Sequence, residues 1–135
     1  EMRELFLNEP TTSMVDLVLQ LVRRHMEGHH INPTIRDRRK RISNDPDAAA
    51  AAISRKRAKS IELIDLIEER LNKEPELRVL DSCSSSTEAM LIAGLVREAL
   101  WLAMESPDAD CSLDLGARLD TSLTLITDFM KGMRW

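Results

Sequence analysis

The sequence predicts an all-α fold, a helical bundle of four main helices plus one or two short helices. Only 3% of the 135 residues are aromatic, and tyrosine is missing. Leucine, methionine and alanine supply much of the apolar content, and these residues favour helices, whereas strands favour β-branched and aromatic residues. No segment alternates apolar and polar residues as a half-buried strand does. A chain of this length can bury a core of its own, so we expect a single domain over residues 1–135.

The first 28 residues predict a short helical turn followed by a longer helix. Residues 2–9 precede Pro10, which ends the turn. Ser13 provides an N-cap with Asp16 three residues later, close to a capping-box arrangement. An apolar face then recurs at helical spacing until Gly28, a residue suited to the end of a helix.

A polar segment over 29–45 separates this helix from the longest one. We expect this basic segment to be mobile, or to form at most a short helix. Residues 44–47, Asn-Asp-Pro-Asp, supply a cap, a proline for the first helical position and an acid for the first turn. A helix should then run to Asn72, with an apolar stripe that is thin over the alanine-rich first half. We expect that half to be exposed or closely approached by another backbone.

Two further helices are predicted in the second half of the chain. Ser85 and Glu88 have the spacing of a capping box, and the helix that follows, about 87–105, is apolar almost all round. We expect it to be the central helix, because a helix without a polar face is a buried one. A last amphipathic helix should cover 113–131. Its expected inward residues are Leu115, Leu119, Leu123, Ile126, Phe129, Met130 and Met133. Before these helices, we expect either a buried connector or a short helix at Leu77, Val79 and Leu80.

Charge is distributed unevenly along the chain. The net charge is −4, but residues 1–60 hold 12 Lys and Arg against 8 Asp and Glu, while residues 61–135 hold 7 against 15. Nine cations form a basic strip within 36–59: Arg36, Arg38, Arg39, Lys40, Arg41, Arg55, Lys56, Arg57 and Lys59. Such a strip either contacts phosphates or faces an acidic protein surface. No aromatic residue is interleaved for base stacking and no nucleic-acid-binding motif is present, so we favour the protein-facing interpretation.

The long helix sorts its charges along its length, with the cations of 55–59 followed by Glu62, Asp65, Glu68 and Glu69. An antiparallel second copy would place basic against acidic residues on both sides of a two-fold axis. The alternative is an ordinary surface helix whose charges interact within their own turns. Trp135, after the amphipathic last helix, is either an exposed docking residue or a residue folded back on the core.

Other polar residues give weaker indications. His25 and His29 are four residues apart, but Met26 stands where a metalloprotease has glutamate, so we interpret them as polar residues at a helix end. Cys83 precedes a helix N-terminus, which can activate a thiol, yet a capping turn explains it more simply. Asp108, Asp110 and Asp114 resemble a calcium loop in outline and lack its glycine and final glutamate. Separately, Ser43 and Ser60 follow basic residues, as kinase targets do.

We therefore expect a non-enzymatic protein–protein interaction domain with an adaptor, regulatory or assembly role, self-associating as a homodimer and needing no cofactor. The alternative is a nucleic-acid-binding regulator or packaging protein that uses the basic strip. The longest apolar run, 89–96, is far shorter than the ~20 residues of a membrane span. Two cysteines in a domain that needs no disulfide indicate reduced thiols and a cytoplasmic location.

Overall fold

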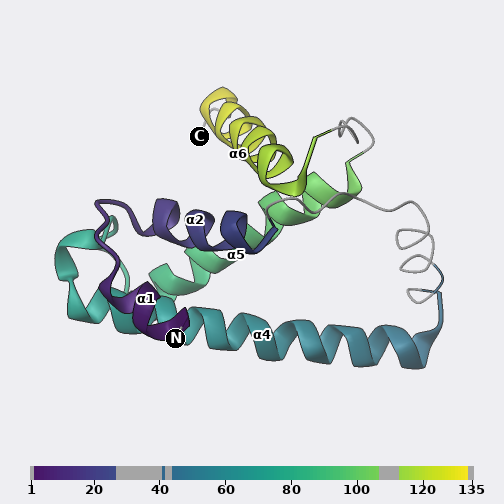
Figure 1. Ribbon diagram of the computed structural model, residues 1–135, viewed down its shortest axis with the longest axis horizontal. Helices are drawn as coiled ribbons and strands as arrows, with labels where there is room; N and C mark the ends of the chain where they lie inside the picture. The colour runs from purple at the N-terminus through teal and green to yellow at the C-terminus, as the bar shows by residue number, and fades with distance from the viewer. Residues whose placement is uncertain (1, 27–40, 42–43, 107–112, 134–135) are drawn as a thin grey trace. The chain divides into compact units, whose positions relative to one another are not determined.

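The computed structural model describes residues 2–26, 41, 44–106 and 113–133, and this part of the chain is all-α (Figure 1). Its elements are α1 (Met2–Asn8), α2 (Met14–Met26), α4 (Pro46–Lys73), the 3-10 turn η1 (Pro75–Leu77), α5 (Ser85–Glu105) and α6 (Leu115–Gly132). The prediction of an all-α helical bundle with four main helices is confirmed. The predictions made for the segments 29–40 and 107–112 lie outside the described residues.

The chain divides into two compact units, and α2 and α5 each contribute residues to both. The first unit comprises 1–17 and 32–93, and the second comprises 18–31 and 94–135. The expected single domain over the whole chain stays a prediction.

Local capping explains where the helices begin. The Ser13 hydroxyl accepts the Asp16 N–H at 3.3 Å. Asp45 accepts from Asp47 N at 3.1 Å, and Pro46 occupies the first turn of α4 as predicted. Asp114 accepts from Ala117 N at 2.9 Å at the start of α6. Because a cap needs only residues within one turn, these boundaries were accessible from sequence.

The first unit is held together by a small apolar core and by hydrogen bonds from a buried arginine to the backbone at the end of α1. Buried residues of this core are Phe6, Met14, Leu17, Ile67, Leu71, Leu77, Ala89, Ile92 and Ala93. Arg70 of α4 is only 1% exposed, and its guanidinium donates to the carbonyls of Phe6 at 2.6 Å and Glu9 at 2.7 Å. Phe6 lies in the last turn of α1, where carbonyls have no helical partners, and Glu9 directly follows the helix. Arg70 therefore fastens the end of α1 to α4.

In the second unit the buried apolar residues come from α2, α5 and α6. They are Val18, Leu19, Val96, Ala99, Ala103, Leu115 and Leu119. Gly116 is buried as well, and a Cβ at that position would lie 3.1 Å from Cγ of Arg23. The Arg23 stem thus passes directly over the α6 backbone, and its guanidinium pairs with Asp120. This close approach is what a glycine permits.

The connector and the start of α5 differ from the sequence-based expectations. Leu77 is buried and ends the short 3-10 helix η1, but Val79 is 82% exposed and Leu80 is also exposed, so the expected buried connector is wrong. The cap of α5 lies one residue before the predicted one, because the Ser84 hydroxyl accepts from Thr87 N. Glu88 accepts from the connector in place of the expected capping box. Glu88 accepts from the N–H groups of Val79 and Leu80, which is why their backbone is held while their side chains face solvent.

The apolar residues of α5 and α6 are less completely covered than predicted. Helix α5 has nearly the expected bounds, but it buries mainly small residues such as Ala89 and leaves Met90 exposed. On α6, Leu115 and Leu119 are buried as expected, whereas Phe129 is 69% exposed and Met130 is exposed too. Periodicity identifies the apolar face of a helix, but it does not establish that another element covers that face.

Candidate interaction surface on helix α4

The N-terminal half of α4, residues 46–62, is a helix without a core of its own. None of its described side chains is buried, and the first buried residue of α4 is Ile67. Ile53 is 55% exposed and Ile61 is 58% exposed. Figure 1 shows this half extending beyond the part of α4 that lies beside α1. We expected this half either to be exposed or to be approached by another backbone. The structure shows it exposed.

The sequence forms a helix here because of local preferences alone. Asp45 caps the start and Pro46 fits the first turn. The run of alanines over 48–52 has the highest intrinsic helix propensity. A helix of about 15 residues is only marginally stable in water without tertiary contacts. Burial against a further surface would therefore stabilise this half of α4.

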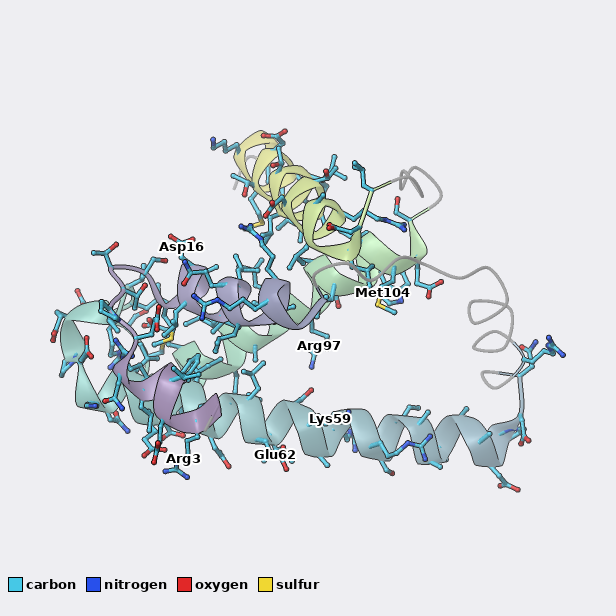
Figure 2. All side chains as sticks on the ribbon, in the orientation of Figure 1. Arg3, Asp16, Lys59, Glu62, Arg97 and Met104 are labelled. Carbon is cyan, nitrogen blue, oxygen red and sulfur yellow. The ribbon has the colours of Figure 1, made fainter. Side chains whose placement is uncertain are left out.

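Charge changes sign near the middle of α4. Arg55, Arg57 and Lys59 are exposed on the N-terminal side of the change. Glu62 and Asp65 are exposed on the other side, and Figure 2 labels Lys59 and Glu62 at the transition. The charge sorting anticipated from sequence thus lies on a solvent-facing helix. It is available to a partner.

The predicted contact residues are only partly described. Arg41, Arg55, Arg57 and Lys59 are exposed, as a contact surface requires. Lys56 lies in α4 but its side chain is not described. Arg36, Arg38, Arg39, Lys40 and Trp135 lie outside the described residues. The basic strip as a continuous surface therefore stays a prediction.

The cations of α4 do not share one side of the helix. Successive residues are rotated by about 100° in an α-helix. Arg55 and Arg57 are thus roughly 200° apart, while Lys59 returns towards the side of Arg55. A row of phosphates would contact only some of them. This geometry favours a partner that uses individual charges over one that needs a continuous basic ridge.

The weaker candidates receive little support from their surroundings. Cys83 is a half-buried free thiol in the turn before α5, and its carbonyl accepts from Arg78. Asp114 acts as the N-cap of α6. Ser60 is half-buried within α4. The remaining candidates, His29, Ser43, Asp108 and Asp110, lie outside the described residues, as does the His25 side chain.

Among the residues that the structure describes, no cluster of three or more His, Cys, Asp or Glu side chains could hold a metal ion. An open depression beside α1 is lined by Glu4, Leu5, Asn8 and Glu9. No helix within the described ranges is both long and apolar enough to cross a membrane.

Sequence reasoning missed three buried charged residues that shape the two units. Arg70 lies between Ile67 and Leu71 on α4, and Arg118 of α6 is only 3% exposed. Glu88 is 2% exposed; burial disfavours its charged form, but the N–H groups of the connector and the nearby guanidinium of Arg78 outweigh burial and lower its pKa. A charged residue inside an apolar stripe was the only sequence signal for the two arginines.

Comparison with known proteins adds no relative. The chain matches no family model, and it shows no significant similarity to a curated protein or to a solved structure. The function must therefore be argued from the chain itself.

Proposed function

We propose that the chain is a non-enzymatic protein–protein interaction domain with an adaptor, regulatory or assembly role, and that it self-associates. The observation that carries the proposal is the N-terminal half of α4. None of its described side chains is buried, and even the large apolar side chains of Ile53 and Ile61 are exposed to solvent. Fully burying an isoleucine side chain is worth about 1.5–3 kcal/mol relative to exposure. A protein surface packed here would supply the burial that this half lacks.

A second copy of the chain is the partner that the charges favour. Over residues 55–69 of this helix, exposed cations precede exposed carboxylates. A surface with both signs in sequence is complementary to its own antiparallel copy. A purely basic partner or a purely acidic one would match only half of it. Self-association therefore uses the whole charge pattern.

The alternative is nucleic-acid binding through the exposed cations of the basic strip. Arg41, Arg55, Arg57 and Lys59 are exposed and could contact phosphates. The rotation of the α4 cations around the helix, described above, counts against a single phosphate row. We therefore favour the protein-binding function and make nucleic-acid binding an outcome of its test.

Light scattering over a range of protein concentrations tests the proposal, at low and high salt and with a mixed-sequence oligonucleotide. We expect a dimer that persists at high salt, because apolar burial is insensitive to screening. We also expect its mass to be unchanged by the oligonucleotide. A monomer that binds the oligonucleotide at low salt and releases it at high salt would overturn the proposal and support phosphate binding.

A further inference from the structure

We propose that two copies pair through antiparallel α4 helices, with Ala58 of each copy against Ile61 of the other and Arg55 against Glu62. This inference rests on the proposed function, since it names the partner and the register of that self-association. Of the two exposed isoleucines of α4, the register buries Ile61. It follows from the exposed side of α4, from the sizes of the residues there and from the placement of charge.

The exposed side of α4 forms a regular seam. Residues spaced alternately by four and three lie along one side of a helix. On α4 such a series is Ala51, Ser54, Ala58, Ile61, Asp65 and Glu68. All six are exposed except Glu68, which is half-buried. By rotation around the helix, this seam lies opposite the buried residues Ile67 and Arg70. It therefore stays exposed past the sign change as far as Asp65.

Residue size along the seam distinguishes antiparallel from parallel pairing. The first half is small, with Ala51, Ser54 and Ala58, and the second half carries the longer Asp65 and Glu68. Antiparallel pairing sets Ala51 against Glu68 and Ser54 against Asp65, so that small residues receive long ones. Parallel pairing would set alanine against alanine and carboxylate against carboxylate. Like charges placed directly opposite each other are destabilising.

Charges flanking the seam set the register. Arg55 and Glu62 are seven residues apart and hence lie on the same edge of the seam, and both are exposed. With Ala58 opposite Ile61, an antiparallel copy brings each Arg55 beside the other copy's Glu62, giving two opposite-charge contacts per dimer. Exposed ion pairs add little affinity. Their role here is to select orientation and register, as flanking charges do in paired helices.

Charge reversal tests the contacts. The dimer dissociation constant is measured by sedimentation equilibrium for wild type, Arg55→Glu, Glu62→Arg and the double variant. Each single variant replaces two attractive contacts by two repulsive ones, so we expect at least about a 10-fold weaker dimer. The double variant exchanges the charges, and its dissociation constant should return to within about 3-fold of wild type. Circular dichroism confirms that each variant is folded.

Lys59 supplies the matched control. Lys59→Glu makes the same change of charge as Arg55→Glu, but Lys59 is rotated about 40° further from the seam than Arg55. We expect its dimer to be unchanged within about 3-fold. Equal weakening by Lys59→Glu and Arg55→Glu would reduce the effect to net charge and overturn the proposed register.

A distance measurement tests orientation independently. A spin label is attached at Ala50→Cys in a chain that also carries Cys83→Ser and Cys111→Ser. With the proposed register, residue 50 lies opposite residue 69 of the other copy, so the two labels are separated by about 29 Å along the helices at 1.5 Å per residue. Parallel pairing would leave them about 10 Å apart, the spacing of packed helices.

The outcomes separate the two proposals. A wild-type chain that is monomeric at every concentration would overturn both self-association and this register. A wild-type dimer whose double variant is not restored, or whose labels lie at the short distance, would overturn the register alone. Restored pairing together with the long distance would support both.

Discussion

Replacing Arg70 by methionine should destabilise the first unit far more than its single position suggests. The guanidinium donates to the carbonyls of Phe6 at 2.6 Å and Glu9 at 2.7 Å, and it pairs with Glu74 at 2.9 Å. Methionine keeps much of the apolar stem but leaves the buried Phe6 carbonyl without this donor. Hydrogen bonds to charged groups contribute about 1.5–3 kcal/mol each. Part of that gain is offset by the cost of burying the arginine, so we expect a loss of about 3–5 kcal/mol.

Urea unfolding at neutral pH measures this loss. The loss should be easy to detect, because the free energy of unfolding of an ordinary domain is only about 5–15 kcal/mol. Hydrogen exchange should show that the α1 amides lose protection first, since Arg70 fastens the end of that helix. Lys73→Met is the control. Lys73 also contacts the end of α1, at Leu7 O and Asn8 Oδ1, but it is exposed, so a loss below about 1 kcal/mol is expected.

Arg118→Met is the sharper comparison. Arg118 is 3% exposed, nearly as buried as Arg70, yet its Nε and Nη1 have no hydrogen-bond partner among the described residues. Replacing a poorly paired buried charge by an apolar side chain is often neutral or stabilising. We expect the free energy of unfolding of Arg118→Met to be within about 1 kcal/mol of the wild-type value, or higher than it. If both variants lost the same free energy, the partners of Arg70 would not be the cause, and the reasoning would be refuted.

Three further changes test other parts of the structure. Glu88→Gln should be destabilised at neutral pH. Because the folded-state pKa of Glu88 is lowered, its contribution is present above the ordinary glutamate pKa and is lost as the pH falls through the lowered one, so unfolding curves of variant and wild type should converge in acid. Gly116→Ala should stabilise by about 0.5 kcal/mol if the half-exposed Arg23 stem can shift, and thermal unfolding showing a net loss would mean that it cannot. Ser84→Ala should cost about 1 kcal/mol by removing the cap on Thr87 N, and an unchanged denaturation midpoint would place the cap elsewhere.

How much was predictable depends on the range of the interactions involved. The starts of α2 and α4 follow from Ser13 and Asp45, which act on N–H groups two or three residues away. The role of Arg70 depends on Phe6, which is 64 residues distant, and no local pattern identifies that partner. The same holds for Glu88, whose contacts with the connector replaced the expected capping box. Helix existence was therefore predictable, while buried polar contacts were not.

The candidate surface on α4 illustrates the same limit in a different way. The apolar stripe visible in the sequence, with Ile67 and Leu71, is the core-facing side, and it says nothing about the opposite side, where Ile61 is the single large apolar residue. The charge sorting was visible too, but its availability to a partner depends on which charges already pair within the chain. Glu69, for example, pairs with Arg3 of α1 at 2.7 Å.

Within the described residues, Arg55 and Glu62 make no ion pair, although both are exposed on the same edge of α4. A sequence does not distinguish charged residues that pair within the chain from those that can pair with a partner. Only the packing of α1 beside one half of α4 separates them, because it occupies Glu69 and leaves the edge with Arg55 and Glu62 open. An interface hypothesis for α4 should therefore be judged on these two residues. The nine cations of the basic strip, counted together, do not discriminate between a phosphate surface and a second copy of this helix.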